Sequence, residues 1–202
     1  MSNQLVYSSS LNGAAFLLFE LEQVIRLKVE ELENKEIRKK VVEKNLFQYN
    51  NPGRINRALP SVMRRSEVFD QTLCELFLQG TVEEKKAMNL YAIMKTDLLF
   101  YEFMNEVIRV KVEDNNFFLE KKDLNGFFTE KAEQSERVAS WSEINTTKLK
   151  RAYMQVLFES GVLRTRKGQD LMPLFIENEL RQHLMSIGDR KYLLAMGDNG
   201  DL

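Results

Sequence analysis

Positive charge collects in one short stretch of the chain. The segment "NNPGRINRALPSVMRR", residues 50–65, contains four arginines and no acidic residue, whereas the whole chain of 202 residues carries a net charge of −1. A guanidinium group is planar and presents its donors as a fork that matches a phosphate, so an all-arginine surface suits a polyanion. The stretch therefore predicts a phosphate-contacting site, and its members are Arg54, Arg57, Arg64 and Arg65.

The arginine stretch has the periodicity of an amphipathic helix. With Arg54 at 0° and about 100° per residue, the four arginines occupy an arc of roughly 100°. The apolar side chains fall between about 40° and 180°, and they are Ile55, Ala58, Leu59, Val62, Met63 and Phe69. Pro60 lacks an N–H and clashes with the preceding turn, so it either kinks this helix or begins a new one. A solvated polar face is the alternative interpretation of the arginines.

A second basic cluster lies closer to the C-terminus, and Glu159 is the only acid within it. Its cations are Lys148, Lys150, Arg151, Arg164, Arg166 and Lys167. On a helix capped by Asn145 or Thr146, the side chains of Lys148, Arg151 and Gln155 share a polar face opposite a core face. A helix with basic and amide side chains followed by a basic hairpin or loop has the layout of a winged helix-turn-helix DNA reader. A surface helix with a flexible basic loop is the alternative.

The residues needed for most enzyme chemistry are missing. His183 is the only histidine and Cys74 the only cysteine, too few for a zinc site. The sequence contains neither a Gly-x-x-x-x-Gly-Lys phosphate loop nor Gly-x-Gly-x-x-Gly, and no nucleophile-elbow motif accompanies the histidine. We therefore expect a non-catalytic protein with no cofactor and no metal. The pI near 6.0 means that any polyanion site is local.

The elements that must position these cations are predicted to be helices. Glycine is scarce, proline occurs only at 52, 60 and 173, and apolar residues recur at spacings of three and four. We expect an all-α, compact multi-helix bundle around a long buried central helix at about 82–113. Helix-turn-helix-like units are expected at about 35–66 and 123–160, with either a small wing hairpin or an extended loop at about 162–176. One helical domain covers 1–202, with 1–81 and 82–202 as alternative subdomains.

Several helix ends and core positions are also predicted. A first helix spans about 12–34 and includes Lys28, whose aliphatic stem lies along the core. Thr81 is expected to cap the central helix in a capping box with Glu84, and Gly80 to end the helix before it. A last helix is expected at about 174–186, and the tail "GDNGDL" at 197–202 is expected to be frayed. Cys74 lies in an apolar helical setting and is expected to be an inert core thiol.

The N-terminal region does not predict a membrane segment. The first nineteen residues carry no side-chain charge, but seven Ser, Asn and Gln residues interrupt them, and a spanning helix needs about 20 mainly apolar residues. No basic region precedes the run, so a secretory signal is not expected. A single cysteine fits a reducing compartment. We expect a cytoplasmic, monomeric protein that does not contact membranes.

Four segments carry a resemblance to a known family: "YSSSLNGAAFLLFELEQV", "NLFQYNNPGRINRALPSVMRR", "NLYAIMKTDLLFYEFMNEV" and "KAEQSERVASWSEINTTKLKRAYMQVL". They resemble the BrxA family of bacteriophage-exclusion (BREX) defence systems from about Tyr7 to about Leu163, most specifically over Lys131–Ser142. The resemblance implies a cytoplasmic helical protein that works beside a methyltransferase, an ATPase and a phosphatase-like protein. It also implies DNA binding and a helical core like that of NusB-type antitermination domains. It supplies no catalytic residues.

Three functional hypotheses follow. The first is a DNA-binding accessory protein of BREX that contacts duplex phosphates through the two basic clusters, in a salt-dependent and weakly sequence-specific way. The second is an adaptor whose basic clusters contact acidic surfaces of other BREX proteins, with apolar surface near Trp141 and Phe117–Phe118 as its hot spot. The third, suggested only by the NusB-type likeness, is RNA binding, although the sequence has no aromatic-rich strand motif for it.

Overall fold

The computed structural model describes residues 6–167 and 169–198, and in these residues the fold is all-helical, as the apolar spacing predicted. The helices are α1 (Leu18–Lys28), α2 (Asn34–Glu43), α3 (Pro52–Ser66), α4 (Gln71–Gln79), α5 (Val82–Thr96), α6 (Leu98–Phe103), the π-helical stretch η1 (Met104–Ile108), α7 (Arg109–Glu113), α8 (Lys121–Gln134), α9 (Glu136–Ala139), α10 (Glu143–Ser160), α11 (Asn178–Ser186) and α12 (Arg190–Ala195).

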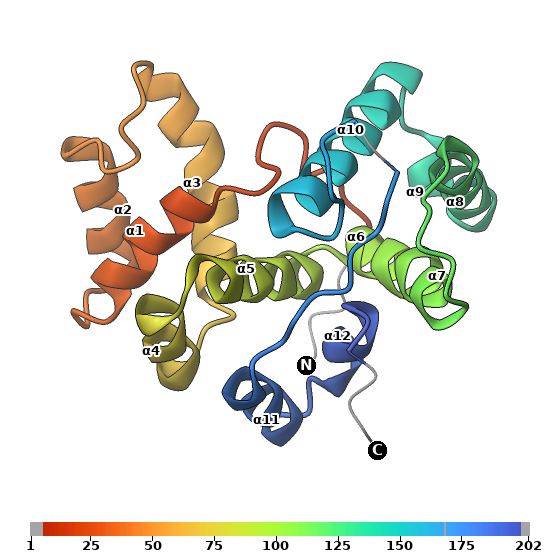
Figure 1. Cartoon of the computed structure of the whole chain (residues 1–202). Helices are drawn as coiled ribbons and strands as arrows, with labels where there is room; N and C mark the ends of the chain where they lie inside the picture. The colour runs from red at the N-terminus through yellow and green to blue at the C-terminus, as the bar shows by residue number, and fades with distance from the viewer. Residues whose placement is uncertain (1–5, 168, 199–202) are drawn as a thin grey trace.

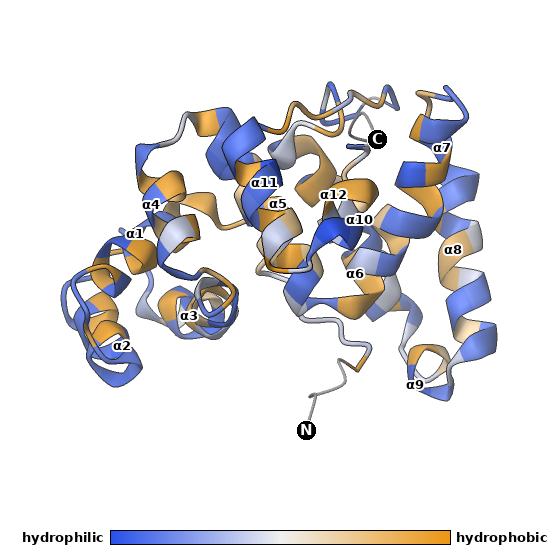
Figure 2. Ribbon diagram, turned by 90° about the horizontal axis from the view of Figure 1, so that it is seen from below, coloured by the Kyte–Doolittle hydropathy of each residue, from blue (hydrophilic) through white to orange (hydrophobic). Residues whose placement is uncertain are grey.

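The helices are arranged around a central row formed by α5, α6, η1 and α7 (Figure 1). Helices α1–α4 lie on one side of this row and α8–α10 on the other, while α11 and α12 cover it from below in that view. Helix α5 contacts α3, α10, α4 and α12. The buried apolar side chains form one continuous cluster that extends from Leu11 to Met196, and the helices turn their hydrophilic faces outward (Figure 2).

The long central helix predicted for 82–113 is interrupted. Asp97 adopts an extended conformation (φ −134°, ψ 102°), ends α5 and caps α6, because its carboxylate accepts the Phe100 N–H at 3.0 Å. The same carboxylate accepts the Ser10 hydroxyl at 3.1 Å. Burial is nevertheless as the sequence predicted, since every residue from Ala87 to Met94 on α5 is buried.

Predicted helix ends have mixed outcomes. The capping box at Thr81 is confirmed: the Thr81 hydroxyl accepts the Glu84 N–H at 3.3 Å, and the Glu84 carboxylate accepts the Thr81 N–H at 2.5 Å. Helix α1 begins at Leu18 rather than at about residue 12, because the preceding residues form a loop. Helix α10 begins earlier than predicted and is capped by Ser142, whose hydroxyl accepts the Asn145 N–H at 3.2 Å. Helix α3 continues through Pro60.

A strand–turn–strand wing does not form at 162–176 among the described residues; Gly168, in its turn, lies outside them. The segment is an extended loop closed by an isolated antiparallel bridge between Leu163 and Leu171, in which the Arg164 N–H donates to the Asp170 carbonyl at 3.0 Å. The pairing ends soon afterwards because Pro173 lacks an N–H.

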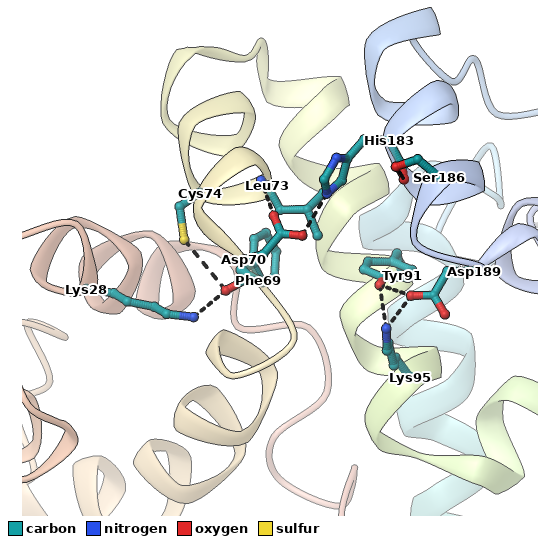
Figure 3. Close-up of polar contacts among 10 residues, drawn as sticks. All are labelled: Lys28, Phe69, Asp70, Leu73, Cys74, Tyr91, Lys95, His183, Ser186 and Asp189. Atoms are coloured by element: carbon teal, nitrogen blue, oxygen red, sulfur yellow. Dashed lines mark hydrogen bonds and ion pairs between the residues drawn. The ribbon is translucent and has the colours of Figure 1, made fainter. Parts of the chain in front are cut away.

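Polar contacts hold the two C-terminal helices against the bundle (Figure 3). The His183 Nε2 of α11 lies 2.7 Å from the Asp70 carboxylate that caps α4. The Tyr91 hydroxyl of α5 donates to Asp189 at 2.5 Å, and Lys95 bonds to both groups. The predicted last helix begins at Asn178 and is shorter than expected, and α12 follows it in a stretch for which the sequence predicted no helix. Residues 199–202 of the predicted frayed tail lie outside the described part of the chain.

Two side chains near α4 were assigned to the core from the sequence. Lys28 is half-buried, but its ammonium does not snorkel to water as predicted: it donates to the Ser66 carbonyl at 2.7 Å and to the Phe69 carbonyl. Cys74 is buried, and burial raises the pKa of its thiol, which keeps it in the unreactive protonated form (Figure 3).

Candidate nucleic-acid interface

The two predicted basic clusters meet in one groove. Helices α3 and α10 face each other across a loop formed by residues 10–17, and the space between them has a volume of about 660 Å³ (Figure 1). Arg54 and Arg57 line it from α3, and Lys148 and Arg151 line it from α10. We call this space the α3–α10 groove. About 90 residues of sequence separate the two pairs of cations, and the fold brings them together.

The α3–α10 groove has an uncompensated positive charge. Its lining contains no aspartate or glutamate, and none of its four cations has a carboxylate within 4.0 Å among the residues that the structure describes. Several cations elsewhere on the surface are paired, for example Arg26 with Glu22 at 2.5 Å and Arg109 with Glu113 at 2.7 Å. The charge in the groove is therefore available to an external anion.

Local contacts position the α3 side of the groove. Asn51 caps the helix by accepting the Gly53 N–H at 2.8 Å, so the chain turns into α3 just before the first arginine. The Arg54 guanidinium stacks on the Tyr49 ring, with its central carbon 4.5 Å from the ring centroid. The Tyr49 hydroxyl donates to Glu20 at 2.5 Å, which fixes the orientation of the ring. Burial and this hydrogen bond raise the pKa of the Tyr49 hydroxyl.

Arg65 does not belong to the predicted phosphate site. Its guanidinium is 3% exposed and donates to three successive carbonyls, those of Ala14, Ala15 and Phe16, at 2.5–2.8 Å. Burial lowers the pKa of this guanidinium to about 10, so it stays charged at neutral pH. The side chain supports the loop beneath the groove instead of facing solvent.

Further hydrogen bonds hold the same loop. Asn12 donates to the side-chain oxygen of Asn145 at 2.6 Å, which connects the loop to the first turn of α10. The buried Asn89 side chain of α5 donates to the Phe16 carbonyl at 2.7 Å. The loop therefore has contacts with α3, α5 and α10 and lies between the two basic helices.

The remaining predicted cations lie outside the α3–α10 groove. Arg64 is exposed on α3 but does not line it. Lys150 and Arg166 line a neighbouring groove between α8 and α10, and Lys167 lines a small cavity of about 190 Å³ beside it. Arg164 lines a wide groove that adjoins the α3–α10 groove and whose lining, unlike that of the α3–α10 groove, includes glutamates. The second predicted cluster is thus divided among several surfaces.

Sequence reasoning missed three side chains at these grooves. Tyr49 and Asn12 line the α3–α10 groove, and Lys121 lines the groove between α8 and α10. Tyr49 lies in the loop five residues before Arg54. A cation–π contact between a loop residue and a helix residue has no characteristic spacing in the sequence, so it could not be predicted. Asn12 was placed inside a predicted helix, and Lys121 was assigned to neither basic cluster.

Other kinds of site find no support in the described residues. No three histidine, cysteine, aspartate or glutamate side chains there approach one another closely enough to hold a metal ion. None of the helices in that part of the chain combines the length and the apolar character needed to cross a lipid bilayer.

Comparison with known proteins supplies the family. Residues 6–188 match the family model of BrxA. A BREX protein BrxA from Bacillus cereus (strain H3081.97) is 36% identical over 194 residues, which are 96% of this chain and 97% of that protein. The chain belongs to the BrxA family. A more distant BREX protein BrxA, from Escherichia coli O9:H4 (strain HS), is 18% identical over 94% of this chain and 89% of its own length.

BrxA is a family of the BREX phage-defence systems. A solved structure shows the same fold as this chain. The crystal structure of an uncharacterized protein from Magnetospirillum magneticum superposes with a TM-score of 0.82 at 18% identity, covering 94% of this chain and 97% of that one. All residues that line the α3–α10 groove lie inside the range matched by the BrxA model.

Proposed function

We propose that this protein is a non-catalytic, cytoplasmic DNA-binding accessory of a BREX phage-defence system that acts as a monomer. The α3–α10 groove binds the sugar–phosphate backbone. The observation that carries the proposal is the convergence of Arg54, Arg57, Lys148 and Arg151 on one groove whose lining has no acid. Membership of the BrxA family supports a role in BREX phage defence, and the buried, unpaired Cys74 is consistent with a reducing compartment.

Charge geometry favours a phosphate backbone over a small anion. The cations come from two facing helices, so they reach an extended ligand from both sides, as successive phosphates along a strand require. Arginine forks bind phosphate oxygens bidentately, and the stacked Arg54 is already ordered before binding. Contacts of this kind orient the protein on the duplex and carry no sequence information by themselves.

The test is a charge reversal on each side of the groove. Arg57→Glu and Lys148→Glu should each weaken binding of duplex DNA, and the double variant should weaken it further, because both side chains face the same space. Each lost phosphate contact should reduce the slope of log K against log salt by about 0.9. Fluorescence anisotropy at several salt concentrations measures both quantities.

A matched control is Lys39→Glu on α2, which makes the same charge change at an exposed side chain that does not line the groove. It should leave affinity within about twofold of the parent. Parent-like DNA binding by the double groove variant, with its fold intact by circular dichroism, would refute the proposed groove.

A second function, as an adaptor for other BREX proteins, is supported by a surface that adjoins the α3–α10 groove and shares Tyr49, Arg54 and Gln155 with it. A groove of about 1090 Å³ is lined by apolar side chains from the start of α1 and from the 161–177 loop, and Phe175 is 77% exposed there. Large exposed apolar patches are typical of protein-binding sites.

Of the hot spot expected from sequence, Phe117 and Phe118 are exposed, whereas Trp141 packs against the core. If the adaptor function is correct, Phe175→Ser should lose binding to other BREX proteins in a pull-down and should bind DNA as the parent does.

A further inference from the structure

We infer that α10 is a recognition helix that enters the major groove of B-form DNA, with the two backbones of the duplex held in basic grooves on its two sides. The inference rests on the proposed function, because one of those grooves is the α3–α10 groove. It goes further by assigning base reading to named side chains and by selecting duplex DNA over RNA.

The second basic groove lies on the other side of α10. It has a volume of about 780 Å³ and runs between α10, the first half of α8 and the basic loop. Lys121, Lys150 and Arg166 supply its charge, and its lining contains no aspartate or glutamate. We call it the α8–α10 groove. Lys150 is partly ordered there, since it donates to the Asn125 side-chain oxygen at 2.8 Å and lies over the Phe128 ring at 5.4 Å from its centroid.

Two side chains of α10 line both grooves, and they are Arg151 and Gln155. They are four residues apart, so they lie one above the other on the exposed crest between the grooves. The helical wheel agrees: with Lys148 at 0°, the crest falls near 300–340°, and the core-facing Leu149 and Tyr153 lie near 100–140°. Ile144, which is 71% exposed, falls at about 320° and extends the same crest toward the helix N-terminus.

The dimensions of the two partners fit. An α-helix with its side chains is about 10–12 Å across, and the major groove of B-DNA is about 12 Å wide. When a helix fills the major groove, the two phosphate backbones run along its two sides. A crest helix with an acid-free basic groove on each side has the complementary arrangement. A protein that bound a single nucleic-acid strand would need only one such groove. The second groove on the other side of α10 therefore favours a duplex as the ligand.

The crest side chains have the chemistry of base reading. Arginine pairs bidentately with the O6 and N7 atoms of guanine, and a glutamine amide pairs with N6 and N7 of adenine. Arg151 lines both grooves, and on this arrangement it contacts a base while Arg54, Arg57 and Lys148 contact the backbone. It has no acidic partner among the residues described by the structure. The Gln155 amide donates to Glu159 at 2.9 Å, a bond on the exposed surface that also fixes which way the amide points. Ile144 and the methyl group of Thr147 provide apolar contacts of the kind that a thymine methyl accepts.

This arrangement excludes double-stranded RNA as the preferred ligand. The major groove of an A-form helix is deep and narrow, so side chains of an inserted helix do not reach the base edges. A protein that used only backbone contacts would bind both duplexes. Insertion of α10 therefore predicts both sequence preference and preference for DNA, and the two properties should be lost together.

The experiment is sequence selection from a randomised DNA duplex with the full-length protein, followed by anisotropy with the enriched and a scrambled duplex. The parent should enrich a short motif and bind it more tightly than the scrambled duplex. Arg151→Ala and Gln155→Ala should each reduce that ratio by roughly 5- to 150-fold or to unity, the range for one bidentate base contact. Arg57→Ala, as the control, should weaken both duplexes equally and leave the ratio unchanged.

The outcomes separate this inference from the proposed function. If no motif is enriched, if the ratio survives both crest substitutions, or if a duplex RNA competes as well as duplex DNA, the recognition role of α10 is wrong while groove binding stands. If Arg57→Glu and Lys148→Glu have no effect on any nucleic acid, the proposed function itself fails. All substituted side chains are exposed, so thermal unfolding temperatures should match that of the parent, which confirms that each variant is folded.

Discussion

Arg65 is the residue on which the shape of the candidate site most depends. Three successive carbonyls, from Ala14 to Phe16, point at one buried guanidinium. Buried carbonyls need a hydrogen-bond partner, and residues 14–16 have none from a strand or a helix. The five donors of arginine satisfy all three at once, which a lysine or a methionine would not. The loop beneath the α3–α10 groove is therefore held from α3.

Replacement of this side chain should unfold the loop or the protein. Arg65→Met keeps much of the volume but leaves the Ala14 and Ala15 carbonyls unpaired and the Phe16 carbonyl with Asn89 as its remaining donor, and we expect the free energy of unfolding to fall by about 2–4 kcal/mol. Arg64→Met is the matched control. Because the Arg64 side chain is exposed, the free energy of unfolding of this variant should stay within about 0.5 kcal/mol of the parent. Urea unfolding of both variants measures the difference, and equal stabilities would contradict the role given to Arg65.

The sequence alone could not separate these two arginines. On the helical wheel Arg65 lies near 20°, at the border of the apolar arc, and Arg64 lies near 280°. What buries Arg65 is the loop that crosses α3 from residues 14–16, and the sequence predicted a helix over those residues. A burial that depends on a segment some 50 residues away leaves no local pattern.

At the scale of the helices, local caps were predictable and long-range ones were not. The capping box of Thr81 and Glu84 uses residues three apart, and it was found from the sequence. Asp97 interrupts the central helix in the middle of an apolar run, and its hydroxyl partner Ser10 is 87 residues away. Periodicity correctly predicted that the run is buried, because burial is set by the spacing of apolar residues, but it could not reveal the break.

The contact of α11 with α4 should be visible as a pH effect. Partial burial raises the pKa of Asp70, but the Leu73 N–H and the His183 ring lower it by more, so it lies below its ordinary value. A lowered carboxyl pKa contributes stability that is present above about pH 4 and is lost as pH falls through the folded-state pKa. His183→Gln should therefore lose less stability than the parent on acidification.

The size of this difference is limited by solvent. The Asp70 side chain is 44% exposed, so screening keeps the contribution below about 1 kcal/mol. Urea midpoints at steps between pH 2 and pH 5 measure it, and Gln182→Ala, an exposed neighbour on the same helix, is the control. Parallel acid profiles for the parent and His183→Gln would mean that the Leu73 N–H alone lowers the pKa of Asp70.

At the scale of the molecule, the N-terminal segment joins the two sides of the bundle. Ser10 bonds to Asp97 in the central row, residues 14–16 bond to Arg65 on α3, and Asn12 bonds to Asn145 on α10. From the sequence, the arginine helix and the second cluster were two separate phosphate sites. Their union depends on this segment and on the central row, and charge spacing along the chain contains no information about either.

The bond between Asn12 and Asn145 tests whether the spacing of the two basic helices matters for binding. Asn145→Ala removes the acceptor at 2.6 Å but changes no cation and no side chain that lines the α3–α10 groove. We expect a stability loss of about 1 kcal/mol from the lost hydrogen bond. DNA affinity should fall severalfold, because part of the binding energy is then used to reposition the loop. The slope of log K against log salt should stay unchanged, since the number of phosphate contacts is the same.

Anisotropy titrations at three salt concentrations distinguish this loss of affinity from a charge effect. A reduced slope would show that Asn145 supports the phosphate contacts themselves, and an unchanged affinity would show that the loop does not set the spacing of α3 and α10.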